Sequence, residues 1–160
     1  MHESLFYLGG IFMSAKRVSI VSLKMVKERS LLYSNRTIRS PHDGASLFRE
    51  YLGEADREHF ILMGLNTKNE PTLLHTVSIG TLNASLVCPR EVMKAIILSN
   101  SASFMVCHNH PSGNPSPSPE DIEVTKRLQE VGNLLGTELL DHIVLGENGN
   151  YLSMKEKGYL

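Results

Sequence analysis

The sequence predicts a single α/β domain in which helices flank a mixed β-sheet. Short apolar segments alternate with longer segments whose apolar residues recur at helical spacing. A proline begins each helical segment, and turn residues separate the strands. The chain has 160 residues, of which 41% are apolar and 21% charged. This composition is sufficient for one domain with a hydrophobic core and excludes wholesale disorder.

The first half of the chain predicts one helix and three strands. A segment rich in β-branched residues predicts a strand over 18–26. A helix over 41–52 begins at a serine–proline pair and ends before a glycine. The apolar residues 58–65 then predict a strand, which turn residues connect to another strand over 71–79.

The second half predicts two helices and three strands. A proline and a stripe of apolar residues predict a helix over 89–99, and a short apolar run predicts a buried strand over 103–108. A proline-rich loop leads to a helix over 119–135. An asparagine–glycine turn connects the last two strands, 138–145 and 151–154.

The overall composition excludes several classes of protein. There are 16 Lys and Arg against 17 Asp and Glu, so the chain lacks the strongly basic balance of a protein held on DNA by bulk charge. Its 2 cysteines cannot form a disulfide scaffold or a four-cysteine zinc site, and they fit a reducing cytoplasm. No apolar run approaches the ~20 residues that a membrane span requires. We therefore expect a cytoplasmic protein with no membrane association.

Charge is distributed unevenly along the chain. Residues 14–40 hold seven basic residues and one acidic residue, a net charge of +6, whereas residues 41–160 hold nine basic and fifteen acidic residues, a net charge of −6. A solvated strand and loop would explain the basic segment, and so would a small surface for an acidic partner such as DNA. Residues 1–13 show no clear period and predict a poorly ordered extension, which leaves residues 14–160 as the domain.

The segment from Cys107 to Asp121 contains the residues most suited to chemistry. His108 and His110 are two positions apart, so their side chains point to the same side of a strand and can converge on one ion. Asp121 would supply a third ligand. Two nitrogens and one carboxylate oxygen suit zinc and leave a fourth position for water.

The loop between the histidines and the aspartate is stiff, because each proline fixes its own φ. Four prolines lie within nine residues: Pro111, Pro115, Pro117 and Pro119. Ser118 and Asp121 also have the spacing of a capping box, so they could serve only to begin a helix. The Ser118 hydroxyl has one donor and two acceptor lone pairs, so it can cap the helix and still donate outward.

The same segment resembles a known signature. Residues 108–113 (HNHPSG) and 115–121 (PSPSPED) resemble the JAMM motif, His-x-His-Pro-x6-Ser-x2-Asp, of the JAB/MPN metalloprotease-like domains. Within that superfamily the chain is similar to RadC-like proteins, which residues 88–92 and 140–144 also resemble. The resemblance covers about residues 35–160. It implies the JAB/MPN architecture, which is similar to that of the cytidine deaminases.

The resemblance also implies a glutamate on an earlier strand that acts as general base and acid. Glu58, at the start of the apolar strand, is the best match, and Glu54 and Glu70 are less well placed. One carboxylate can take a proton from water and return it to the leaving amine. The alternative is that Glu58 is an exposed residue at the start of a strand.

By the same resemblance, His108, His110 and Asp121 bind Zn²⁺, and Ser118 donates a hydrogen bond to the developing oxyanion. The implied protein is a zinc-dependent hydrolase, a metallopeptidase or isopeptidase that acts on a peptide or protein substrate. One alternative is a DNA-repair-associated RadC-like protein, either a metal-dependent nuclease or an accessory factor that contacts DNA through residues 14–40. Another is an MPN-like scaffold without activity.

Three further residues are expected to have structural roles. Cys107 is adjacent to His108 on the strand, so it faces the opposite side and is expected to be a small core residue. Asp141 and His142 recur in the family. We expect them to be structural or to orient a metal ligand from behind.

Overall fold

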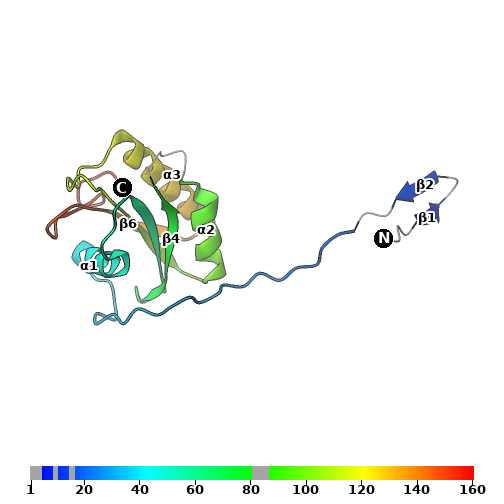
Figure 1. Ribbon diagram of the computed structural model, residues 1–160, viewed down its shortest axis with the longest axis horizontal. Helices are drawn as coiled ribbons and strands as arrows, with labels where there is room; N and C mark the ends of the chain where they lie inside the picture. Colours follow the sequence, from blue (N-terminus) through cyan, green and yellow to red (C-terminus); the bar gives the residue numbers. More distant parts are fainter. Residues whose placement is uncertain (1–4, 9–10, 15–16, 81–86) are drawn as a thin grey trace.

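A computed structural model describes residues 5–8, 11–14, 17–80 and 87–160 of the chain. The domain is a mixed β-sheet flanked by three helices (Figure 1), which confirms the predicted α/β class. In chain order the elements are β1 (Leu5–Leu8), β2 (Ile11–Ser14), α1 (Pro41–Leu52), β3 (His59–Leu65), β4 (Pro71–Ile79), α2 (Pro89–Leu98), β5 (Ser103–Asn109), α3 (Pro119–Leu135), β6 (Glu138–Leu145) and β7 (Tyr151–Ser153).

The five strands of the main sheet lie in the order β4-β3-β5-β6-β7. All neighbours are antiparallel except β5 and β6, which are parallel and are connected by α3. A parallel pair needs such a crossover, because a tight turn can join only antiparallel strands. The crossover returns the chain across the sheet, and the proline-rich loop and the first turn of α3 therefore follow directly from the end of β5.

The core has two layers, one on each face of the sheet. On one face, α1 packs over the side chains of alternate strand residues that include Met105 and Cys107. On the other face, α2 and α3 pack over a set that includes Phe104 and Val106. Cys107 thus faces away from His108, as predicted, and burial raises the pKa of its thiol. Such a thiol is inert packing material.

The structure differs from the sequence prediction at residues 18–26. This segment has no regular secondary structure, and all of it is exposed. β-Branched residues favour an extended backbone, but a strand also needs a neighbour to accept and donate its backbone hydrogen bonds. No described residue pairs with this segment, so the predicted strand is wrong for this chain alone.

At the N-terminus, β1 and β2 form an antiparallel pair. Residues 1–4, 9 and 10 lie outside the described residues, so the predicted poorly ordered extension over 1–13 stays a prediction. None of the helices in the described part of the chain is long and apolar enough to cross a bilayer.

Candidate metal centre

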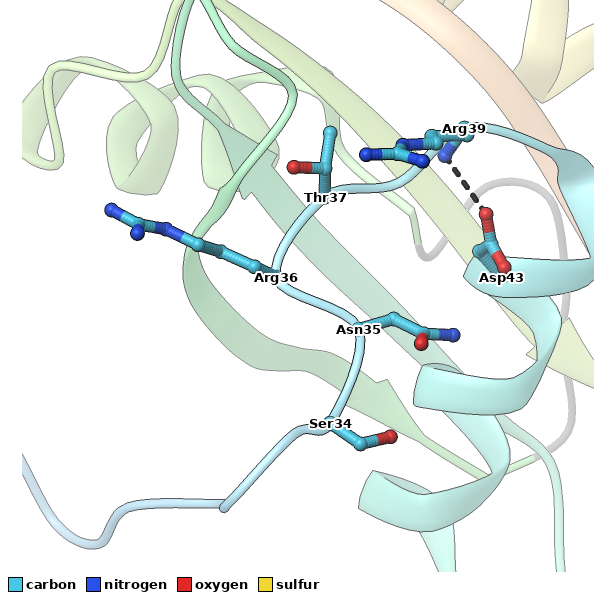
Figure 2. Close-up of a pocket in the computed structure, with 6 residues that line it drawn as sticks. All are labelled: Ser34, Asn35, Arg36, Thr37, Arg39 and Asp43. Atoms are coloured by element: carbon cyan, nitrogen blue, oxygen red, sulfur yellow. Dashed lines mark hydrogen bonds between the residues drawn. The ribbon is translucent and has the colours of Figure 1, made fainter.

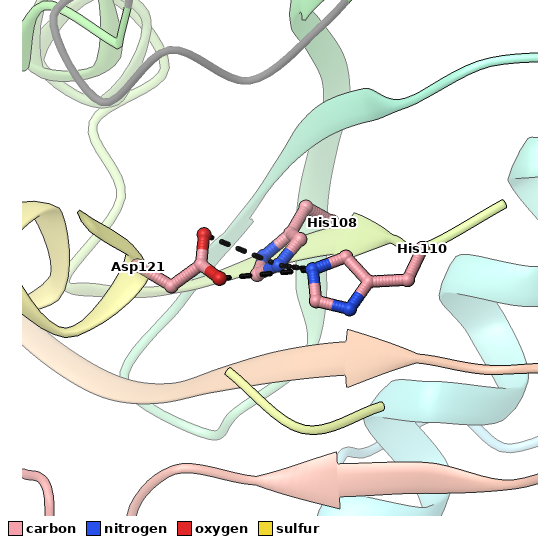
Figure 3. A group of neighbouring side chains, drawn as sticks. All are labelled: His108, His110 and Asp121. Carbon is pink, nitrogen blue, oxygen red and sulfur yellow. Dashed lines mark hydrogen bonds and ion pairs between the residues drawn. The ribbon is translucent and has the colours of Figure 1, made fainter. Parts of the chain in front are cut away.

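The three predicted ligand residues come together at the end of β5 (Figure 3). The Nε2 atoms of His108 and His110 are 3.0 Å apart. Asp121, in the first turn of α3, places Oδ1 at 3.4 Å from His108 Nε2 and Oδ2 at 3.6 Å from His110 Nε2. His108 and Asp121 are buried, and one ligand atom from each of the three residues lies within 4.8 Å of the others. The donor set is therefore assembled by the fold.

Asp121 is held in this position by the start of its own helix. The backbone N–H and the hydroxyl of Ser118 both donate to Asp121 Oδ2 at 2.7 Å, and the N–H of Asp121 donates to Ser118 Oγ at 3.1 Å. The residues thus form the predicted capping box, while Asp121 Oδ1 still faces His108. The Asp121 side chain can therefore cap the helix and still be one of the candidate ligands.

The capping box also uses the Ser118 hydroxyl proton. Because a hydroxyl has only one proton, Ser118 does not donate outward while it donates to Asp121. Donation from Ser118 to a substrate oxygen, as the family resemblance implies, would require its hydroxyl to rotate away from Asp121.

The hydrogen bond behind His110 leaves its Nε2 available to a cation. Its Nδ1 lies 2.8 Å from the carbonyl oxygen of Asn114, which can only accept, so Nδ1 carries the hydrogen. The neutral ring therefore has its lone pair on Nε2. The protonated ring would donate a hydrogen bond to Asp121, and this bond raises the pKa of His110 against the opposing effect of burial, with smaller contributions from Asn114 and from the charges of Asp121 and Glu58. A proton and a metal ion would compete for this site.

A buried chain of hydrogen bonds fixes His108 in the same way. The Thr125 hydroxyl lies 2.6 Å from the carbonyl oxygen of Asp121 and 3.5 Å from Met154 Sδ, which are both acceptors. With its proton donated to the Asp121 carbonyl, Thr125 accepts from His142 Nδ1, which is 2.6 Å away. The lone pair of His142 Nε2 then accepts from His108 Nδ1 at 2.7 Å.

With His108 fixed in this way, three electron-rich groups face one another at the site: His108, His110 and Asp121. His142 is neutral, because burial lowers its pKa well below the ordinary value. His108 carries its hydrogen on Nδ1, and its Nε2 lone pair faces the Nε2 lone pair of neutral His110 and the Asp121 carboxylate. Burial raises the pKa of Asp121, but the favourable interactions of the carboxylate with the two imidazole rings and its hydrogen bond from Ser118 bring this pKa below the ordinary value, so the carboxylate is ionised. Two lone pairs and an anion at these distances suit a bound cation.

Thr125 was missed by sequence reasoning. Its only signal is its spacing of four residues from Asp121, which places both side chains on the same face of α3. Asp141 has the structural role that was expected. It accepts from the N–H of His142 at 2.8 Å and from Ser153 Oγ at 2.5 Å, so it ties β6 to β7 beside His142.

The Thr125 hydroxyl can be tested with a matched pair of substitutions. We expect Thr125→Val to weaken zinc binding by about 10–100-fold, because it removes the acceptor that fixes the tautomer of His142 and thereby that of His108. Thr125→Ser keeps the hydroxyl and is expected to bind zinc as the native chain does. Affinities come from competition with a chromogenic chelator. Equal affinities of the valine and serine variants would show that the hydrogen-bonded chain does not tune the site.

His142 also predicts how the metal-free protein responds to acid. The folded chain keeps His142 neutral, whereas the unfolded chain binds a proton near the ordinary pKa of 6.5. At pH values below 6.5, each further decrease of one pH unit is expected to reduce the free energy of unfolding by about 1.4 kcal/mol through this one residue. Chemical denaturation between pH 7 and pH 5, compared with His142→Gln, measures this contribution. Parallel stability profiles for the two proteins would contradict it.

Glu58 lies directly before β3 and is half-buried. Its negative charge contributes to the raised pKa of His110, which places the carboxylate within electrostatic reach of the cluster. The strand register also places Glu58 near the cluster, because Phe60, two residues after Glu58, lies opposite His108 on the neighbouring strand β5. Of its rivals, Glu54 is exposed, and Glu70 follows the other end of β3, where it forms an ion pair with Arg36 at 2.7 Å.

Asn109 holds the backbone on both sides of Glu58. Its side-chain oxygen accepts from the N–H of His59 at 2.8 Å, and its side-chain amide donates to the carbonyl of Arg57 at 3.0 Å. The residue between the two histidines of the motif is thus a clamp that connects the end of β5 to the start of β3. Glu58 is positioned by Asn109, which lies between the two candidate histidine ligands.

The chain is similar in sequence to known proteins. The model of the RadC-like JAB domain family matches residues 38–159. The UPF0758 protein YsxA of Bacillus subtilis (strain 168) is 48% identical over 99% of this chain and 69% of its own length. UPF0758 proteins of Bacillus pumilus and Geobacillus thermodenitrificans are 52% and 51% identical over 77% and 80% of this chain, which spans 54% and 57% of their respective lengths. The family model covers every residue of the cluster as well as Glu58, and the chain belongs to the RadC-like JAB domain family.

Proposed function

We propose that this protein is a zinc-dependent hydrolase that cleaves amide bonds, a metallopeptidase or isopeptidase with a peptide or protein substrate. The observation that supports it is the convergence of His108 Nε2, His110 Nε2 and the Asp121 carboxylate, with the second nitrogen of each ring already hydrogen-bonded. Imidazole and carboxylate ligands in this number suit zinc with one open position. A zinc ion held there would activate a water molecule at neutral pH and polarise the substrate carbonyl.

The proton transfers are assigned to Glu58. Its carboxylate takes the proton of the attacking water as the new C–O bond forms, and returns that proton to the amide nitrogen as the C–N bond breaks. Water supplies the oxygen of the carboxyl product and the hydrogens that complete the acid and the amine, so no further reactant is needed. Asn109 supports this role because it fixes the peptide groups on both sides of Glu58.

Zinc content and metal-dependent hydrolysis of the purified, untagged chain test this function. We expect about one zinc ion per chain by inductively coupled plasma mass spectrometry. We also expect cleavage of a proteome-derived peptide library that stops after chelation and returns when zinc is added. Cys88→Ser controls for adventitious zinc on the partly exposed thiol, and it should change neither result. A chain that takes up no zinc when zinc is supplied would contradict the proposal.

A further inference from the structure

Residues 17–32 form an extended arm that leaves the domain and makes few contacts with it (Figure 1). The arm carries a run of large apolar side chains, each more than half exposed: Val18, Ile20, Val21, Leu23, Met25 and Val26. Monomeric soluble proteins rarely leave such a contiguous apolar segment in water. The composition of the arm therefore indicates that a partner covers it.

The root of the arm is attached to the domain. Arg36 Nε lies 2.7 Å from Glu70 Oε1, the N–H of Ile38 donates to the carbonyl of Asn69 at 2.9 Å, and the N–H of Arg39 donates to Asp43 at 2.9 Å. A polar hollow of about 290 Å³ lies at this root (Figure 2). The arm thus begins from a defined point beside the start of β4.

The edge of the main sheet offers a place for an added strand. β4 is one of the two edge strands of this sheet among the described residues, and after Pro71 its sequence contains no proline, lysine, arginine or acidic residue. Proteins normally protect such an edge with charge, proline, a bulge or a covering segment. β4 has two irregularities in its register with β3, at Val77 and Thr72, but between them it presents no charge and no proline. Ile79 at its end is 61% exposed, and His75 in its middle is also exposed.

The arm and this edge are complementary in length and pattern. The β-branched segment 18–26 has nine residues, and β4 also has nine. Ile20 and Val26 lie on one face of an extended chain, and Val21 and Leu23 lie on the other. A strand that is apolar on both faces is typical of a position covered on both sides. The helices cover the two faces of the sheet, α1 on one side and α2 and α3 on the other, and β4 reaches both clusters through the partly buried Leu74 on one face and Leu73 and Val77 on the other.

Charge favours a second copy of the chain as the partner. The arm holds four basic residues and one acidic residue, a net charge of +3, whereas residues 33–160 hold eleven basic and fifteen acidic residues, a net charge of −4. The arm of one copy is therefore attracted to the domain of another. A nucleic acid would use the basic residues but would leave the apolar side chains without a contact surface, because its affinity comes mainly from the phosphates.

We propose that the arm of one copy adds as a strand to the β4 edge of a second copy, and that the exchange is reciprocal in a two-fold dimer. The backbone groups of both segments would then gain hydrogen-bond partners, and the apolar side chains of the arm would extend the cores of the partner. This dimer does not depend on a metal ion or on hydrolysis, so it stands independently of the proposed function.

Light scattering coupled to size-exclusion chromatography tests the dimer over a range of concentrations. The native chain is expected to be dimeric. Ile20→Asp should weaken dimerisation by about 10²–10⁴-fold, because a reciprocal dimer loses two buried isoleucines, one from each arm. Ser30→Asp introduces the same charge at an exposed polar position outside the segment 18–26, and it should dimerise nearly as the native chain does. His75→Lys places a charge on the exposed edge and should also produce monomers.

Mixing the two monomeric variants tests the exchange between copies. Ile20→Asp has a damaged arm but an intact edge, and His75→Lys has the opposite defect, so an equimolar mixture should regain dimers with one intact exchange. A native chain that is monomeric throughout, or an Ile20→Asp variant that dimerises normally, would overturn the proposal. So would a monomer whose salt-sensitive binding to duplex DNA is lost on reversing Lys24, Lys27 and Arg29, because DNA would then be the partner of the arm.

Discussion

Glu58→Gln is expected to retain zinc and to lower turnover by about 10²–10⁴-fold. Glutamine has the size of glutamate and keeps a hydrogen-bonding oxygen, but it cannot take a proton from water. The three residues that converge on the candidate metal position do not include Glu58, so its neutralisation should leave the donor set intact. Turnover of a peptide cleaved by the native chain and zinc content should be measured on the same preparation.

Glu54→Gln is the matched control for this experiment. Glu54 is exposed and lies four residues before Glu58, so the same chemical change there should alter neither zinc content nor turnover. Loss of zinc from Glu58→Gln would reassign Glu58 as a ligand or as a structural residue. Full turnover with zinc retained would place the general base elsewhere.

Asn109→Ala should give an intermediate result. It leaves the Glu58 carboxylate in the chain but removes the clamp on the carbonyl of Arg57 and the N–H of His59. A misplacement of about 1 Å can cost an enzyme about 10²-fold in rate, so we expect a loss of up to that size with zinc content unchanged. This result would separate the positioning of the carboxylate from its proton chemistry.

The parts of the fold that local sequence signals specify were predicted well. Pro41, Pro89 and Pro119 begin the three helices, as expected. Turns that contain asparagine or glycine with positive φ connect β3 to β4 and β6 to β7, also as expected. The segment 18–26 shows the limit of this reasoning. Its residues favour an extended backbone, but the presence of a strand depends on a partner that local sequence does not identify.

The candidate site also combines features that local sequence predicts with one feature that it does not. The two-residue spacing of His108 and His110 and the helix start at Asp121 are local features, and they predicted the convergence that the structure describes. The support of His108 by His142 is not local. It requires β5 and β6 to be parallel with Val106 opposite His142, which brings together residues 34 positions apart. Spacing along the chain contains no signal for such a register.

The two roles of Asp121 can be separated by substitution. Asp121→Asn is expected to weaken zinc binding by at least about 100-fold, because the amide has no negative charge and presents an NH₂ group toward the histidines. Its remaining oxygen can still accept from the N–H of Ser118, so α3 should keep its first turn. Zinc affinity and thermal unfolding of the metal-free protein should be measured together.

Asp121→Ala and Ser118→Ala complete the comparison. Asp121→Ala removes both the ligand and one half of the capping box, so it should lose zinc and also lower the unfolding free energy. Ser118→Ala removes the hydroxyl that accepts from the N–H of Asp121, at a cost of about 0.5–2 kcal/mol, but leaves all three ligands. Weak zinc binding in both Asp121 variants but near-native binding in Ser118→Ala would identify the carboxylate as a ligand. Near-native binding in Asp121→Asn would reduce Asp121 to a helix cap and leave the histidines as the only members of the cluster that hold the ion.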